Sequence, residues 1–428
     1  MKGLRALWRK PGMRSIGALL VALFMLSACG GSDVGNNSST PTNTAPIKIG
    51  VSVSLSGDFS ADGKATQQGY QLWADYVNAH GGLLGRKVSL DFANDATDTN
   101  QVVTNYQNFI TVKHDDLVLG PYSTLLTKPA SKAAARYGYA MLEGAGGGPS
   151  VFQQGLNNIF DASPPIAGQM NGFVQYILSL PAGQRPATVA YATEDDPFTQ
   201  PMVDTAKAQF DAAGIKSVEY DVYPAETTDF APIAQKIINS KAELVVLGSM
   251  LNDVVAETKA FRQQHYNPKA IIASAGPDQG AQFSGPIGGA RVAEAIFYPN
   301  GWAPSINIPA VSGVPGSISN ADFVQSYIAK YGGAAGDISA DTPEAYSAGQ
   351  VLQQAVEKIK SIDNKKIIDE LHAGHTYQTV QGAVKFDSTG QNTAGIVYVF
   401  QWQKGAVTVV YPSASAAATP EYPKPAWP

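Results

Sequence analysis

The stretch "IKIGVSVSL", residues 47–55, decides how the fold of this chain begins. Its isoleucine and valine residues form an apolar, β-branched run that predicts a buried strand. A helix-length segment with one apolar face follows, and Gly81-Gly82 ends it. "KVSLDFAND" (87–95) then predicts a second strand. A strand, a helix and a second strand in this order indicate the start of a parallel sheet.

The alternation of strands and helices continues through two series. From about Pro164 the rhythm restarts after the first series. Strands that alternate with helices predict parallel sheets covered on both faces, and two such series predict two doubly wound, Rossmann-like lobes of an α/β protein. The further strands are expected at 116–120 and 139–144 in the first series, and at 188–193, 216–223, 243–249 and 270–276 in the second.

The C-terminal part of the chain departs from this rhythm. The pattern there predicts one more strand, two helices and three strand-like runs with period-2 alternation or turn signals. Residues 413–428 are rich in Pro and Ala and are expected to be an extended tail. The predicted elements are a strand at 293–299, helices near 320–331 and 341–360, and the runs "GAVKFD" (382–387), "GIVYVFQWQ" (395–403) and "AVTVVYP" (406–412).

The start of the chain is typical of a bacterial lipoprotein signal. Five basic residues precede the almost wholly apolar run 16–28, which is too short to span a bilayer as a helix. "LSAC" (26–29) resembles the lipobox, in which the cysteine receives a diacylglycerol and becomes the first mature residue. We therefore expect residues 1–28 to be removed and Cys29 to carry a lipid anchor. Residues 29–46 are expected to form a flexible linker.

Composition argues against several classes of protein. From Cys29 onward the chain has 25 basic and 35 acidic residues, a net charge of −10. This balance argues against a nucleic-acid partner, which needs a basic surface, and against a basic membrane-binding face. Because Cys29 is the only cysteine, we expect neither an internal disulfide nor a cysteine-based metal cluster. The length favours two domains.

A ligand site is expected beyond the carboxyl ends of the strands, where open α/β sheets bind ligands. In the first lobe this rule selects "SGDFSADG" (56–63), "PYSTLLT" (121–127) and "GAGGGPS" (144–150). Ser123 and Thr124 precede a helix, so their hydroxyls and nearby N–H groups could hold a carboxylate. A plain N-cap is the alternative role. Because consecutive glycines let a ligand approach backbone donors, anion binding between these loops is the better hypothesis.

Taken in order, these stretches resemble the leucine/isoleucine/valine-binding family of solute receptors for bacterial ABC importers. The resemblance covers roughly residues 47 to 410. It implies the type I periplasmic-binding fold, in which two Rossmann-like lobes joined by three crossovers close over a ligand. The matching pieces are "IKIGVSVSLSGDFSADG" (47–63), "GYQLWADYVNAHGGLLGRKVSL" (69–90), "DDLVLGPYSTLLTKPAS" (115–131), "GAGGGP" (144–149) and "TTDFAPIAQKIINSKAELVVLG" (227–248).

The resemblance also implies where the chain passes between the lobes. The crossovers are expected near 162–165, 291–296 and 385–395. The expected domains are an N-terminal lobe of residues 47–164 plus 292–385, a C-terminal lobe of residues 165–291 plus 386–412, and the tail 413–428.

The family's ligand-binding positions can be carried over residue by residue. Many relatives have a threonine where this chain has Gly147, so one hydroxyl is missing here. The resemblance implies that the ligand carboxylate is held by Thr124 with Tyr122 and Ser123 beside it, that Ala145, Gly146 and Gly147 are small backbone donors, that the aromatic residue of the first loop falls near Asp62, and that the second lobe contributes Phe198 and Met250 as walls.

One position departs from the family pattern in a way that affects the ligand. The family's acidic residue for an amino-acid ammonium falls on Ala275, and a buried ammonium without a counter-charge is strongly disfavoured. Either Asp62, Glu143 or Asp278 supplies the charge, or the ligand is not an α-amino acid but an aromatic or aliphatic acid or an amide. A branched-chain or aromatic amino acid is the preferred hypothesis.

Motifs for catalysis are weak in this chain. "AYSAG" (345–349) lacks the first glycine of a nucleophile elbow and falls in a predicted helix. "HAGH" (372–375) has no acid or third histidine close by and is expected to be a solvated turn. We therefore expect a binding protein rather than an enzyme, with no cofactor and no metal.

The resemblance implies the partners and the location as well. The expected partners are a small-molecule ligand, the permease and ATPase subunits of an ABC importer, and the membrane through the lipid on Cys29. The protein is expected to be an extracytoplasmic monomer, on the periplasmic side if the cell has an outer membrane. A ligand sensor for a signalling partner is the alternative, because it would use the same hinge closure.

Overall fold

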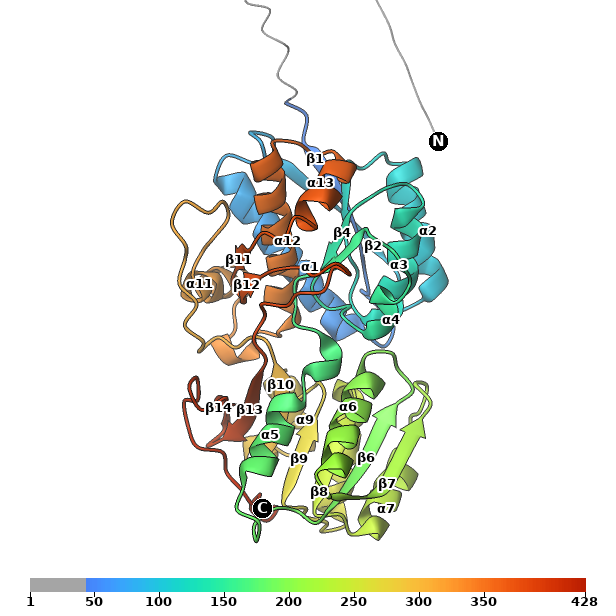
Figure 1. The fold of residues 1–428 in the computed structure, drawn as a ribbon, viewed down its shortest axis with the longest axis vertical. Helices are drawn as coiled ribbons and strands as arrows, with labels where there is room; N and C mark the ends of the chain where they lie inside the picture. Colours follow the sequence, from blue (N-terminus) through green and yellow to red (C-terminus); the bar gives the residue numbers. More distant parts are fainter. Residues whose placement is uncertain (1–43) are drawn as a thin grey trace, which may run out of the picture. The chain divides into compact units, whose positions relative to one another are not determined.

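Two separate sheets organise residues 44–428, the part of the chain that the computed structural model describes (Figure 1). The expected signal peptide, Cys29 and most of the expected linker lie outside the described residues. Within residues 44–428, none of the helices combines the length and the apolar character that a membrane span requires.

The first sheet is parallel throughout and has the strand order β2-β1-β3-β4-β5. It begins with the predicted strand, because Ile47, Ile49, Val51 and Val53 are all fully buried. A small antiparallel hairpin lies in the same lobe. The strands of this lobe are β1 (Ile47–Val53), β2 (Val88–Asn94), β3 (Leu117–Leu119), β4 (Met141–Glu143) and β5 (Ile159–Asp161), with the hairpin β11 (Tyr377–Thr379) and β12 (Gly382–Val384).

Helices cover both faces of the first sheet, and the longest two pack closely against each other. Trp73 of α1 is fully buried, and Gly349 of α12 leaves room for its ring because a side chain at that position would overlap it. This close approach brings the first turn of α12 to the cleft beside α1. The helices are α1 (Ser60–Ala79), α2 (Thr99–Thr111), α3 (Thr124–Ala135), α4 (Pro149–Phe152), α11 (Asn320–Tyr331), α12 (Asp341–Ile359) and α13 (Asn364–Leu371), with the 3₁₀ turn η2 (Ala335–Asp337).

The second sheet has the order β14-β13-β10-β9-β8-β6-β7 and is parallel from β10 to β7. β13 and β14 join antiparallel at one edge. All five residues of β8 are buried, as expected for a central strand covered on both faces. The strands are β6 (Thr188–Glu194), β7 (Lys216–Tyr223), β8 (Leu244–Gly248), β9 (Ala270–Ala273), β10 (Ile296–Asn300), β13 (Tyr398–Gln403) and β14 (Ala406–Tyr411).

The helices of the second lobe follow its strands in the predicted alternation, and the α/β prediction is confirmed for both lobes. They are α5 (Asn171–Ser179), α6 (Thr199–Ala212), α7 (Ala231–Ser240), α8 (Leu251–Gln263), α9 (Ala281–Ile287) and α10 (Ala290–Ala293), preceded by the 3₁₀ turn η1 (Ile166–Gly168).

Two of the expected lobe boundaries need correction. β10 pairs with β9 and β13 in the second sheet, whereas Trp302 packs in the apolar core of the first lobe. The second crossover therefore follows Asn300, later than the expected 291–296, and the N-terminal lobe does not resume at residue 292. The apolar run of β10 was assigned to the wrong sheet, because a buried strand looks alike in either one.

The third crossover also comes later than its expected start. Phe386 packs in the core of the first lobe, and Gln391 forms a parallel bridge with Asp161 of the first sheet. The chain joins the second sheet at β13. The C-terminal lobe therefore does not resume at residue 386.

The tail, residues 413–428, contains neither a helix nor a strand and packs on the second lobe. The Trp427 indole N–H donates to the Tyr266 carbonyl at 2.7 Å, and the Lys424 ammonium lies 3.3 Å from the centroid of the Trp427 ring. The hydrogen bond joins the end of the chain to the segment that follows α8, and the cation–π contact, which lies within the tail, orients the Trp427 ring.

Candidate functional site

The loops at the carboxyl ends of the two sheets meet around a small cavity of about 50 Å³. Six of the predicted binding residues line it. These are Asp62, Tyr122 and Ala145 from the first lobe and Phe198, Ala275 and Asp278 from the second.

The two lobes contact each other across this cleft. The Gln279 side-chain amide of the second lobe donates to Asp62 Oδ1 of the first lobe at 2.6 Å. Met250, at the start of α8, packs against the apolar cluster of the first lobe that contains Phe59 and Tyr122. The cleft is therefore closed, and Met250 contributes to lobe contact rather than to the cavity lining.

Ser123 and Thr124 serve the backbone of their own lobe. The Ser123 hydroxyl accepts a hydrogen bond from the Leu126 N–H at 3.3 Å and so caps helix α3. Thr124 is fully buried, and its hydroxyl accepts from the Gly148 N–H at 3.0 Å. Neither residue lines the cavity, and the plain N-cap role considered for Ser123 is the one that the structure has.

The Glu143 side chain accepts hydrogen bonds from two backbone N–H groups that were expected to hold a ligand carboxylate. Its side chain is fully buried, and its Oε2 accepts from the N–H of Ala145 at 2.7 Å and from the N–H of Gly146. Burial raises the pKa of Glu143 to about 8, although these two hydrogen bonds favour the ionised form. The glycine-rich loop (residues 143–148) thus already holds an internal carboxyl group.

Asp161 explains why a glycine stands at position 147. A side chain on Gly147 would overlap Asp161 Oδ2, and the other oxygen of Asp161 is fixed by the Ser163 N–H at 2.8 Å. Burial, and then the charge of Glu143, raise the pKa of Asp161 well above its ordinary value. A ligand carboxylate at this loop would therefore face two acidic side chains.

Four carboxyl groups line the cavity and form an acidic cluster, defined here as Asp62, Asp278, Asp341 and Glu344. Asp341 and Glu344 lie in the first turn of α12, and the close packing of α12 on α1 brings them beside Asp62. None of the described residues that line the cavity is Lys, Arg or His. The acidic cluster therefore has no basic partner in the cavity wall.

The pKa values of the acidic cluster reflect this lack of counter-charge. Burial, and then the charge of Asp278, raise the pKa of Asp62 to about 7, and burial raises the pKa of Asp278 to about 6. For Asp341 and Glu344, burial followed by a neighbouring carboxylate raises the pKa well above the ordinary value. A bound cation would remove these penalties, since an opposite charge favours the ionised form.

Asp341 and Glu344 are site residues that the sequence analysis missed. Acidic residues are common in the first turn of a helix because they complement its dipole. Their position in the sequence therefore carries no sign of a ligand site. The i, i+3 spacing places both on one helix face, but only the packing of α12 shows that this face meets the cleft.

The other motifs considered for chemistry have structural roles. Ser347 is buried within α12, as predicted. His372 contacts the Asn157 carbonyl at 2.9 Å. His375 contacts Glu370 at 3.0 Å, so an acid does lie beside this motif, contrary to the expectation. Within residues 44–428, no group of three or more His, Cys, Asp or Glu side chains has the arrangement of a metal site.

Comparisons with known proteins agree with this architecture. A sequence profile described as "Periplasmic binding protein" matches residues 46–406. Leu/Ile/Val-binding protein homolog 7 of Brucella abortus is 25% identical over 395 residues, which cover 89% of this chain and 95% of that protein. Homolog 8 of Brucella suis is 25% identical over 388 residues, which cover 89% of this chain and 94% of that protein.

Solved structures with the same fold are more distant in sequence. A leucine-binding protein of Thermotoga maritima matches with a TM-score of 0.72 at 18% identity, covering 85% of this chain and 97% of that one. A solute-binding protein of R. palustris in complex with benzoate matches with a TM-score of 0.71 at 16% identity, covering 88% of this chain and 98% of that one. These two structures confirm the predicted two-lobed, type I fold.

Proposed function

The chain belongs to the periplasmic binding protein family, and on that premise we propose that it is the lipid-anchored solute receptor of an ABC importer. Its ligand is a small solute with a protonated nitrogen, which closes the two lobes over itself. The permease reads the closed arrangement and receives the solute. The family and the closed cleft between the lobes both support this role.

The observation that carries the choice of ligand is the acidic cluster without a basic partner. A buried carboxylate with no counter-charge is costly, whereas a charge-assisted hydrogen bond to an ammonium group is about twice as strong as a neutral one. The cluster can therefore supply the counter-charge that Ala275 cannot. An anionic ligand without a cationic group would meet repulsion from Asp62 and Asp278.

The walls of the cleft support an apolar body on this ligand, and the lobes must separate further to admit it because the present cavity holds only about 50 Å³. Tyr122, Ile166 and Phe198 line the cleft beside the acids. The Brucella relatives are named as Leu/Ile/Val-binding proteins, so branched-chain and aromatic amino acids are the first compounds to test. Amines without a carboxylate belong in the same test, because Glu143 already accepts from two of the N–H groups expected to hold one.

A benzoate-like acid is the second candidate ligand. The benzoate complex of the R. palustris protein supports it by shared fold. The charge of the acidic cluster opposes it, because such an acid brings no positive group.

The test is a thermal-shift screen of the protein without its first 28 residues and with Cys29→Ser. The panel contains leucine and phenylalanine, their deaminated acids, and their decarboxylated amines. A ligand at 100 times its Kd adds about 2.7 kcal/mol of stability, so we expect compounds with a protonated nitrogen to raise the Tm by several degrees. Stabilisation by the deaminated acids alone would refute the proposed ligand.

The lipid anchor is tested separately. In cells, the full chain is expected to incorporate labelled fatty acid and to fractionate with the membrane. Cys29→Ala is expected to lose both properties. Labelling that survives this substitution would contradict the assignment of Cys29.

A further inference from the structure

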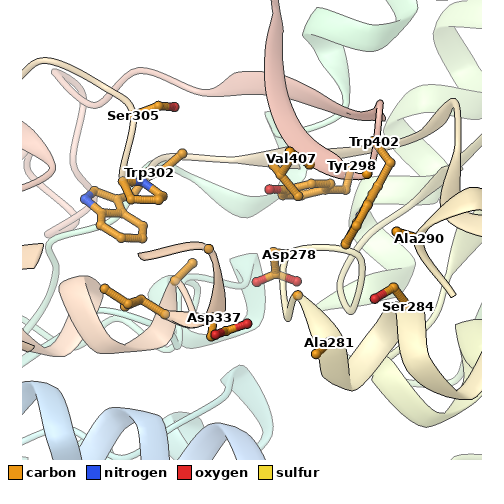
Figure 2. A pocket seen from close by; sticks show the side chains of 18 residues that line it. Asp278, Ala281, Ser284, Ala290, Tyr298, Trp302, Ser305, Asp337, Trp402 and Val407 are labelled. Carbon is orange, nitrogen blue, oxygen red and sulfur yellow. The ribbon is translucent and has the colours of Figure 1, made fainter. Parts of the chain in front are cut away.

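A second and larger cavity shares Asp278 with the cleft, and Figure 2 shows the side chains that line it. Its volume is about 350 Å³. We call it the hinge chamber, defined by Asp278, Tyr298, Trp302, Asp337 and Trp402 among its lining residues. Trp302 and Asp337 belong to the first lobe, whereas Tyr298 of β10 and Trp402 of β13 belong to the second, so both lobes build the chamber.

Neighbouring residues of the same segments separate the hinge chamber from the cleft. Gly280 and Tyr298 line the chamber, whereas Gln279 and Asn300 line the cleft. Asp278 lines both cavities. The two cavities are therefore neighbours, and the Asp278 side chain belongs to the walls of both.

One side of the hinge chamber is aromatic and held in place by its neighbours. The Trp302 indole N–H donates to Asn320 Oδ1 at 2.6 Å, and the Trp402 indole N–H donates to the Pro277 carbonyl at 2.8 Å. Tyr298 stacks on Phe400 with ring centroids 5.0 Å apart. Both indole donors are already used and the two tryptophans are only 2% and 4% exposed, so they offer a ligand no hydrogen bond and only the small part of each ring that borders the chamber.

The other side of the hinge chamber is acidic. Figure 2 shows the carboxyl groups of Asp278 and Asp337 across the cavity from the rings of Tyr298 and Trp402. Asp278 Oδ1 is buried without a hydrogen-bond partner among the described residues. Asp337 Oδ2 accepts from the Ala334 N–H at 3.1 Å. None of the described residues that line the chamber is Lys, Arg or His.

We propose that the hinge chamber is a second binding site, which takes a compact organic cation of the alkylammonium class. Aromatic rings attract such cations through their quadrupole, and because the chamber opens to solvent at Asp337 and Ala281 the attraction expected is that of a partly exposed site. The unpartnered oxygen of Asp278 supplies the opposite charge. The volume falls within the range of small-molecule sites, and a quaternary ammonium group needs no hydrogen-bond acceptor.

The proposal does not rest on the identity of the cleft ligand. The chamber has its own aromatic wall and its own second acid, Asp337, neither of which lines the cleft. A cation in the chamber would contact both lobes, so its binding would favour the closed arrangement in which the chamber is formed.

The test measures choline binding by isothermal titration calorimetry at fixed ionic strength. The protein lacks its first 28 residues and carries Cys29→Ser. The comparison compound is 3,3-dimethylbutan-1-ol, which has nearly the same shape without the charge. Choline is expected to bind saturably, and the neutral compound at least tenfold more weakly. Equal binding of both compounds, or no binding of choline, would overturn the proposal.

Two variants assign the cation to the chamber. Ala281 lines the chamber at the start of α9, and Ala281→Trp is expected to fill it and to reduce choline affinity at least tenfold. Gln282→Trp is the matched control, because Gln282 is exposed like Ala281 but does not line the chamber. It is expected to bind choline like the unsubstituted protein.

A gentler variant covers the case in which Ala281→Trp fails to fold. Asp337→Asn removes a charge from the chamber and keeps an oxygen for the Ala334 N–H, and it is expected to weaken choline binding about fivefold. Asp62→Asn changes the cleft alone. If Asp62→Asn abolishes choline binding while Ala281→Trp or Asp337→Asn leaves it intact, the cation binds in the cleft and the proposal is wrong.

Discussion

The glycine-rich loop and the acidic cluster line the same cleft, but they treat charge in opposite ways. The loop presents N–H groups, and the chain itself fills two of them with the Glu143 carboxyl group. The acidic cluster presents four carboxyl groups, and no basic side chain of the described cavity lining answers them. A charged group in a cleft therefore indicates a ligand where the protein supplies no counter-charge. Asp62 accepts a hydrogen bond from Gln279 but meets no basic side chain in the cavity lining.

The largest effect on ligand affinity is expected from the acidic cluster. Asp62→Asn removes a carboxylate that a protonated nitrogen would contact, and loss of one partner of a buried ion pair costs about 3 kcal/mol or more. The affinity of a stabilising amine or amino acid is therefore expected to fall about 100-fold by calorimetry. Asp75→Asn, on an exposed part of α1, is the control and should bind normally. An unchanged affinity in Asp62→Asn would show that the acidic cluster does not contact the ligand.

Glu143→Ala tests the role of Glu143 in the glycine-rich loop. Two buried N–H groups then lose their acceptor, so the free energy of unfolding is expected to fall by about 2 kcal/mol in urea titrations. The emptied donors should also gain affinity for acetate or a deaminated acid. Glu143→Gln keeps one acceptor oxygen and is expected to lose less stability. If Glu143→Ala is as stable as the original and gains no anion affinity, the loop does not depend on Glu143.

The pH dependence of ligand affinity should show whether the acidic cluster binds a cation. Asp62 and Asp278, with pKa values of about 7 and about 6, are mostly protonated at pH 5.5 and mostly ionised at pH 8. A cationic ligand prefers the ionised cluster, so its affinity is expected to rise about tenfold over this interval by linkage. Titrations at several pH values measure this. Affinity that falls as the pH rises would indicate an anionic ligand.

In the protein without ligand, the raised pKa of Glu143 makes stability fall as the pH rises, whereas the affinity for a cationic ligand is expected to increase. Glu143 has a pKa of about 8 in the folded chain against an ordinary value of 4.5, so the folded state binds its proton more tightly than the unfolded state does. Without ligand, the free energy of unfolding is therefore expected to decrease as the pH rises from about 4.5 to about 8. Glu143→Gln should weaken this dependence, and an unchanged slope would contradict the assignment to Glu143.

The smallest effect is expected at Ser123, which caps α3. Ser123→Ala removes the acceptor of the Leu126 N–H and is expected to lower the free energy of unfolding by about 1 kcal/mol. Ligand affinity should stay within twofold. Ser123→Asn keeps a capping oxygen, and its Cβ meets the same backbone conformation, φ 73° and ψ 151°, that Ser123 already adopts, so it should retain stability. A large loss of affinity in Ser123→Ala alone would return this hydroxyl to the ligand site.

Most strands and helices were predictable because they depend on local patterns. The run 47–55 became β1, the run 188–193 became β6, and the helix expected at 341–360 became α12. β5 was not predicted, although β3 and β4 are equally short, because only the four-residue helix α4 separates it from β4 and the strand–helix alternation is lost there. The strand at 293–299 was recognised but given to the wrong lobe, because apolarity reports burial and does not name the sheet.

The fold class, the two lobes and the loops that face the cleft follow from the order of residues along the chain, since strand–helix alternation and the carboxyl-end rule depend on chain connectivity. The arrangement of charge in the cleft depends instead on how distant segments pack. Asp62, Asp278 and Asp341 come together because α12 packs on α1 and the second lobe closes against both. Glu143 bonds to N–H groups only two and three residues ahead of it, which is a local contact. The fold contributes the burial of this loop, because buried N–H groups need an acceptor inside the protein.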